Sequence, residues 1–162
     1  ISGEQFVDEC QVESDLELLL PATYVTGSSE RMLLYRELDS LTLDKDVEAF
    51  RNRLIDRFGP VPSETEELLR IVPLRRLAAR LGAEKVFLKG GRMSLFFISN
   101  PESPYYQSQA FGKVIAYMMK YTRRCDLREQ NTRRSMLVKD VKNVETAVGV
   151  LQEIVAMQVE EG

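Results

Sequence analysis

The stretch Leu54-Ile55-Asp56-Arg57-Phe58-Gly59-Pro60-Val61-Pro62 contains the end of one predicted helix and leads into the next. Before Gly59, apolar residues recur at helical spacing, which predicts an amphipathic helix. Its apolar stripe consists of Leu43, Val47, Phe50, Leu54 and Phe58. A glycine here suits a left-handed C-cap, and the prolines that follow prevent the helix from continuing. Ser63 is expected to cap the following helix, in which Pro73 predicts a kink or a break.

Patterns on both sides of these two helices predict short strands and further helices. The additional elements are a strand over 12–20, a helix over 29–40, a hairpin over 84–98 that turns at Gly90-Gly91, a helix over 105–121, strands near 125–130 and 134–139, and a final helix capped by Asn143. The order is therefore a strand, three helices and then β-β-α-β-β-α. Long helices beside a few short strands indicate an α+β fold.

The composition is that of a globular protein, because 44% of the 162 residues are hydrophobic and 29% are charged. Histidine is absent, which excludes His-based triads and His metal ligands. The two cysteines, Cys10 and Cys125, are too few for a zinc site or a disulfide scaffold and indicate a reducing, cytoplasmic setting. No apolar run reaches the roughly 20 residues that span a bilayer, so we expect no membrane contact.

The organisation of the chain is predicted to be simple. Residues 1–11 are polar and carry no pattern, so we expect a linker or arm there. Residues 12–162 are then expected to form a single domain and to remain monomeric. Because the chain begins at Ile1, we expect it to be part of a longer protein.

Charge is distributed unevenly, although the formal net charge is only -3. Residues 1–68 hold 6 basic and 16 acidic side chains, residues 69–143 hold 16 and 5, and residues 144–162 hold 0 and 4. One hypothesis is a nucleic-acid-binding module that uses segment 69–143, with Tyr105 and Tyr106 as candidate stacking residues. We favour the alternative that acidic and basic segments neutralise each other within the fold, because the whole chain is acidic.

No catalytic motif is found in the sequence. The phosphate-binding loop, the dinucleotide-binding glycine turn and the nucleophile elbow are all absent. Cys125 lies among Arg123, Arg124 and Arg128, which could lower its pKa, but the favoured interpretation is a small core residue. We therefore predict a domain that is not an enzyme and that needs no cofactor and no metal.

Residues 54–62 resemble the Asp-Arg-Phe-Gly-x-x-Pro signature of the C-terminal domain of transcription-repair coupling factors, the Mfd family. Two upstream stretches are similar to the family's Pro-x-x-Tyr-Ile and Arg-Leu-x-x-Tyr segments. They are Leu20-Pro21-Ala22-Thr23-Tyr24-Val25 and Glu30-Arg31-Met32-Leu33-Leu34-Tyr35-Arg36. The resemblance extends over about residues 12–156.

The resemblance implies the regulatory C-terminal domain of a bacterial ATP-driven DNA translocase that acts in nucleotide-excision repair. In the family, this domain docks on the UvrB-like module of the same chain and hides the surface that UvrA binds. Contact with UvrA and RNA polymerase is therefore expected to be indirect, and DNA is expected to bind to the motor modules that precede this domain.

The resemblance also implies which residues form the docking surface. Acids on the helix that ends in Asp-Arg-Phe-Gly meet arginines of the partner module, and Asp56 matches one of these acids. Arg53 stands where the family has the other acid, so Glu48 on the same exposed face is the candidate replacement, with Asn52 beside it. From the residues alone, Asp56 could instead pair locally with Arg53 or Arg57, and the family match favours the interface.

Overall fold

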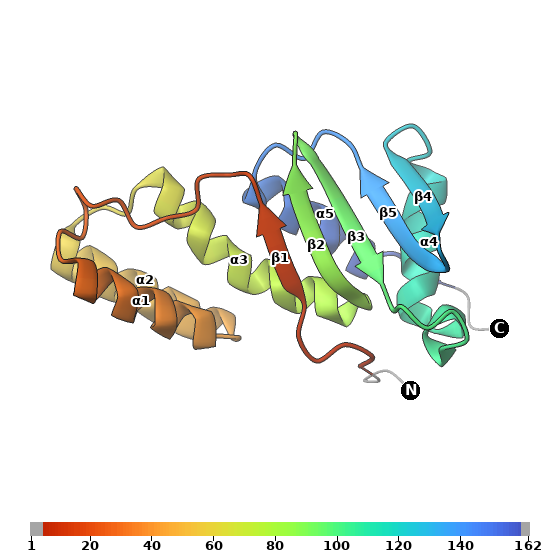
Figure 1. The fold of residues 1–162 in the computed structure, drawn as a ribbon, viewed down its shortest axis with the longest axis horizontal. Helices are drawn as coiled ribbons and strands as arrows, with labels where there is room; N and C mark the ends of the chain where they lie inside the picture. The colour runs from red at the N-terminus through yellow and green to blue at the C-terminus, as the bar shows by residue number, and fades with distance from the viewer. Residues whose placement is uncertain (1–4, 160–162) are drawn as a thin grey trace. The chain divides into compact units, whose positions relative to one another are not determined.

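The structure is a computed structural model that describes residues 5–159 (Figure 1). The elements in chain order are β1 (Gln11–Ser14), α1 (Ser28–Ser40), α2 (Asp44–Phe58), α3 (Ser63–Arg80), β2 (Ala83–Lys89), β3 (Arg92–Phe97), the 3-10 helix η1 (Pro104–Gln107), α4 (Gln109–Lys120), β4 (Cys125–Gln130), β5 (Arg133–Val138) and α5 (Val144–Val155). This order confirms the predicted α+β fold.

The described chain divides into two compact units. Residues Leu16–Pro73 form one unit, called the helical unit below, and it contains α1, α2 and the first part of α3. The residues up to Asp15 and from Leu74 onward form the other, called the sheet unit. The sheet unit holds all five strands of the described chain, together with α4 and α5.

The helical unit is held together by one apolar core, which the predicted stripe of α2 helps to form. The buried members of this core are Leu20, Val25, Leu34, Leu38, Phe50, Leu54, Leu69 and Val72. Leu43 is the exception in the stripe, since it is 49% exposed just before α2 begins. Gly59 has a φ of 90° at the C-cap of α2, which confirms the predicted end of that helix.

Two tyrosine hydroxyls connect the segment before α1 to the helices of this unit. The hydroxyl of Tyr24 donates to the carbonyl oxygen of Gly59 at 2.8 Å, and the hydroxyl of Tyr35 accepts from the backbone N–H of Leu20 at 2.7 Å. The ring of Tyr24 also packs against Phe58, with centroids 5.7 Å apart. The two contacts of Tyr24 fix the end of α2, near which the candidate docking residue Asp56 lies.

The sheet unit contains a mixed sheet with the strand order β1-β2-β3-β5-β4. β1 is parallel to β2, and the other neighbours are antiparallel. In Figure 1, α4, α5 and the last turns of α3 lie behind this sheet. Alternate residues of β2, β3 and β5 are buried against these helices, namely Val86, Leu88, Met93, Leu95, Phe97, Met136 and Val138.

The predicted turn at Gly90-Gly91 is confirmed, and a second tight turn joins β4 to β5. Gly90 and Gly91 have φ values of 60° and 72° and join β2 to β3, a conformation that glycine adopts without strain. Asn131 and Thr132, with φ values of 53° and 65°, join β4 to β5 in the same way. Asn143 caps α5, because its side-chain oxygen accepts from the N–H of Thr146 at 2.7 Å.

Several predicted boundaries are wrong. The strand predicted over 12–20 ends at Ser14, where its pairing with β2 stops. The helix predicted over 105–121 is two elements, η1 and α4, because Ser108 caps α4 by accepting from the N–H of Phe111. α3 is a single helix, so Pro73 does not break it, and the kink stays a prediction. Val72 and Leu74 on either side of Pro73 are 2% and 0% exposed, and their burial offsets the missing backbone hydrogen bond.

The segment predicted to be a linker or arm contributes buried side chains to the sheet unit. Val7 and Cys10 are 6% and 2% exposed, and Phe6 packs edge-on against Tyr105 with ring centroids 5.5 Å apart. Gln11 is already part of β1. The domain boundaries at 11 and 12 stay a prediction.

Candidate protein interface on the second helix

Three of the four predicted interface residues lie along one exposed line on α2. Glu48, Asn52 and Asp56 are all exposed and follow each other at intervals of four residues, which places their side chains on the same face of a helix. The first and last are about 12 Å apart along the helix axis, given a rise of about 1.5 Å per residue. We call these three residues the outer ridge.

The opposite face of α2 explains why the ridge is exposed. Phe50 and Leu54 are each 1% exposed in the core of the helical unit. Because they fix the rotation of the helix about its axis, residues on the other side must face solvent. The sequence pattern therefore predicted the exposure of the outer ridge correctly.

Arg53 and Arg57 lie on the flank of α2 that faces α1. Arg53 forms an ion pair with Glu37, and Arg57 forms one with Glu30. Arg53 also lies over the ring of Phe50, at 5.6 Å from the centroid. Both guanidinium groups are therefore engaged with side chains of their own unit.

Asp56 lies next to both of these arginines in sequence but forms no ion pair with either. Within residues 5–159, no hydrogen bond or ion pair is found for its carboxylate, which is exposed. The local pairing with Arg53 or Arg57, which the sequence left open, is not formed. The geometry leaves a helical carboxylate facing solvent, available to a cation outside the unit.

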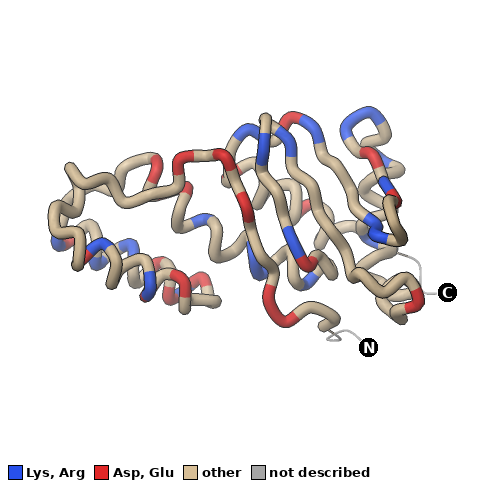
Figure 2. The backbone as a smooth tube through the Cα atoms, in the orientation of Figure 1, with Lys and Arg blue, Asp and Glu red and all other residues tan. Residues whose placement is uncertain are grey.

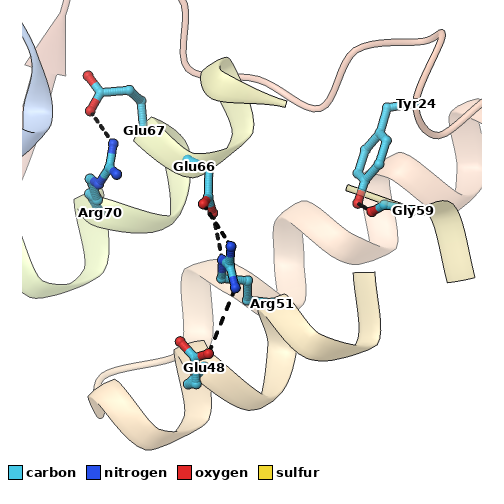
Figure 3. A network of polar contacts seen from close by, with 7 residues as sticks. All are labelled: Tyr24, Glu48, Arg51, Gly59, Glu66, Glu67 and Arg70. Atoms are coloured by element: carbon cyan, nitrogen blue, oxygen red, sulfur yellow. Dashed lines mark hydrogen bonds and ion pairs between the residues drawn. The ribbon is translucent and has the colours of Figure 1, made fainter. Parts of the chain in front are cut away.

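The other flank of α2 is joined to α3 by a two-pronged ion pair, shown in Figure 3. Arg51 donates from Nε to Oε1 of Glu66 at 2.9 Å and from Nη2 to Oε2 of the same residue at 3.0 Å. Nη1 of Arg51 also lies 3.9 Å from Oε1 of Glu48. That long contact leaves the Glu48 side chain 64% exposed, so the ridge position is still accessible.

The sequence did not reveal the acidic residues that form ion pairs with the arginines of α2. Glu66, Glu37 and Glu30 lie 15 to 27 residues from their partners, so no short-range pattern reveals them. Only knowledge of which helices pack together would have found them.

Two other groups that the sequence singled out belong to the sheet unit. Cys125 is 4% exposed, and burial raises the pKa of its thiol although Arg124 acts in the opposite direction. A protonated, buried thiol supports the interpretation of a core residue. Tyr105 is fully buried and donates to the carbonyl of Leu81, so the idea that it stacks on a nucleobase is wrong.

The described residues contain neither a membrane-spanning helix nor a cluster of metal ligands. From residue 5 to residue 159, no helix combines the length and apolar character needed to cross a membrane. Over the same range, no three side chains of aspartate, glutamate, cysteine or histidine come together as metal ligands would.

The fold matches that of a solved structure, and a family model matches the sequence. A crystal structure of the C-terminal domain of a transcription-repair coupling factor has the same architecture, with a TM-score of 0.68 and 17% sequence identity. The similarity covers 91% of this chain and 93% of that one. A sequence model of the TRCF domain matches residues 14–108, which include the outer ridge and the β2–β3 hairpin. The chain belongs to this family, the C-terminal domain of transcription-repair coupling factor (Mfd).

Curated relatives agree with this assignment. The transcription-repair-coupling factor of Rickettsia bellii is 30% identical over 132 residues, which are 81% of this chain and 11% of that protein. Its counterpart in Rickettsia prowazekii is 27% identical over 138 residues, covering 84% and 12%. The Staphylococcus haemolyticus factor is 26% identical over 121 residues, covering 71% and 10%. The chain thus spans between 10% and 12% of the length of these relatives.

Proposed function

We propose that this chain is a regulatory domain that docks on the UvrB-like module of its parent protein through the outer ridge of α2. Docking would cover the surface that UvrA binds, so the parent translocase would not recruit UvrA to repair. The domain itself performs no catalysis, and RNA polymerase and the duplex DNA on which the motor acts are handled by other modules. Membership of the family supports this proposal, and the outer ridge supplies the surface for it.

One observation carries the proposal: Asp56 is an exposed carboxylate without a partner in the described chain, while the two arginines beside it are engaged with α1. A docking partner that presents arginines can therefore pair with Asp56 without first breaking a local ion pair. Such pairs contribute little on an open surface, but they contribute more when the interface excludes water.

The charge of the helical unit agrees with a basic partner. Residues 16–73 contain 11 acidic and 7 basic side chains. Of those bases, Arg51, Arg53 and Arg57 are paired with acids of the same unit. On the outer ridge, Asn52 lies between the acidic residues Glu48 and Asp56 and can accept or donate a hydrogen bond. The role of Arg53, in this proposal, is to hold α1 against α2 rather than to contact the partner.

The test is the affinity of this chain for the separately expressed UvrB-like module, measured by isothermal titration calorimetry. Asp56→Asn keeps the shape of the side chain and removes its charge, so binding should weaken by about tenfold or more if the pair is desolvated. Glu153→Gln makes the same change at an exposed helical position in the sheet unit and should leave binding unchanged. Equal losses in both variants, or no loss in Asp56→Asn, would remove the outer ridge from the interface.

A further inference from the structure

The sheet has a second face, which no helix of the sheet unit covers in Figure 1. Side chains of β2 and β3 alternate between the two faces of the sheet. The residues that lie between the buried ones along each strand therefore point to this open face. They include Lys85, Phe87 and Phe96, all of which are partly exposed. The register agrees, because Phe87 is opposite Ser94 and Lys85 is opposite Phe96.

Two phenylalanine rings lie side by side on the open face. Phe87 and Phe96 come from neighbouring strands, with ring centroids 5.4 Å apart and an interplanar angle of 76°. Phe96 keeps partial solvent access. A pair of partly exposed aromatic rings on an uncovered sheet face is a platform on which planar groups can stack.

Basic side chains surround this aromatic pair. Nζ of Lys85 lies 4.7 Å and Nζ of Lys89 lies 5.2 Å from the centroid of the Phe87 ring. The guanidinium carbon of Arg133 lies 5.7 Å from the centroid of Phe96. Cations close to stacking rings match a ligand that alternates planar bases with negative phosphates.

The cations differ in how far acids already neutralise them. Lys85 pairs with Glu13 at 3.1 Å, and Arg133 pairs with Glu84 at 3.2 Å. Lys89 and its cross-strand neighbour Arg92 have no acidic partner in the part of the chain that the structure describes. Figure 2 shows basic positions in blue at the turns that join the strands. The β2–β3 turn therefore offers positive charge beside the aromatic pair.

We propose that this open face binds single-stranded nucleic acid, with bases stacked on Phe87 and Phe96 and phosphates held by Lys85, Lys89 and Arg92. On binding, the two lysines would leave the ring of Phe87 to the base and pair with the flanking phosphates. A duplex fits less well, because its bases are already stacked and paired and cannot reach a flat sheet. All of these residues lie in the sheet unit, so the proposal is independent of the docking role of Asp56 in the helical unit.

The first test compares strands of different kinds with the 162-residue chain. Fluorescence anisotropy would measure the binding of labelled oligonucleotides of about 12 nucleotides, a length within the usual site sizes of such surfaces. Single-stranded DNA, single-stranded RNA and a DNA duplex are compared at about 50 mM and about 200 mM salt. We expect both single strands to bind more tightly than the duplex, with affinities that fall as salt rises. No binding of single strands at low salt would overturn the proposal and leave the face to a protein partner.

The second test separates stacking from charge attraction alone. Phe87→Leu and Phe96→Leu keep an apolar side chain on the sheet but remove the ring, and each should weaken binding by about fivefold or more. Phe58→Leu makes the same change at a partly exposed ring of the helical unit and should have no effect. Lys89→Gln with Arg92→Gln should reduce the salt dependence. Unchanged affinity in both leucine variants, with circular dichroism showing folded protein, would overturn the stacking proposal.

Discussion

Arg51 and Glu66 join α2 to α3 by two parallel hydrogen bonds, of 2.9 Å and 3.0 Å. Nε and Nη2 of the guanidinium each donate to a different carboxylate oxygen. Their side chains are 36% and 26% exposed, so water screens the pair only in part. This fork is a geometry that arginine provides and lysine does not. It fixes the flank of α2 beside the outer ridge.

Replacing Arg51 with lysine should therefore lower the stability of the helical unit. Arg51→Lys keeps the charge but loses one of the two hydrogen bonds, and we expect the free energy of unfolding to fall by about 1 kcal/mol. Urea denaturation measures this change. Arg36→Lys, at an exposed position on α1, is the matched control and should change stability little. Equal stability of Arg51→Lys and wild type would show that the fork contributes nothing beyond charge.

Reversing the charge of Asp56 should weaken the proposed closed form of the full-length parent protein. Asp56→Arg would set like charges against the arginines of the UvrB-like module, at a cost of about 2–5 kcal/mol. The fold should tolerate the change because Phe50 and Leu54 on the opposite face of α2 are untouched. UvrA should then bind the full-length variant more tightly than the wild type in the absence of polymerase. Equal UvrA affinities from equally folded proteins would count against the docking role.

Adding one methyl group at Gly82 should destabilise the sheet unit strongly. A Cβ built at this glycine would lie 2.0 Å from the ring of Tyr105, and its φ is 86°. The buried ring cannot move away, so Gly82→Ala should cost about 2–4 kcal/mol. Gly90→Ala is the control, because its φ of 60° imposes strain while nothing lies within 4 Å of the added atom. It should cost about 1 kcal/mol, and equal losses in thermal or urea unfolding would contradict the steric explanation.

The stability of the protein should fall at alkaline pH partly because of Cys10. Burial raises the pKa of this thiol from 9.0 to about 12, and Arg75 opposes the shift by a smaller amount. Between these two values the unfolded chain releases the proton and the folded chain keeps it. The stabilisation is complete below pH 9 and is lost as the pH rises toward 12.

Urea unfolding of wild type and Cys10→Ala at about pH 8 and about pH 10.5 would measure this effect. The variant should lose less stability over the interval than the wild type does. Some dependence should remain, because burial also raises the pKa of Tyr105. Identical pH dependence in the two proteins would show that Cys10 ionises normally when folded.

Local signals in the sequence were sufficient for the elements that end at glycine or begin at a cap. Gly59, the Gly90-Gly91 turn and Asn143 each act within a few residues, and the structure places element boundaries at all of them. The exposure of Asp56 was predictable for the same reason, because the helical period alone separates it from Phe50 and Leu54.

Features that depend on distant partners were not predictable. The alternating pattern of 12–20 continues past Ser14, but only its first residues meet β2, and Leu20 is buried in the core of the helical unit instead. Pro73 is accommodated within α3 because the burial of Val72 and Leu74 offsets the backbone hydrogen bond that proline cannot form. The acids that occupy Arg53 and Arg57 belong to another helix, so only the tertiary structure could show that Asp56 is left without a partner.

The outermost strand has a consequence for the behaviour of the protein at high concentration. β4 lies at the edge of the sheet, and all its residues after Cys125 are exposed. Its free edge could template the addition of a strand from another molecule, the first step of aggregation. The charged residues Asp126, Arg128 and Glu129 oppose this, because an incoming strand would have to strip water from each of them. The charged side chains of β4 thus protect the protein from polymerising through this edge of the sheet.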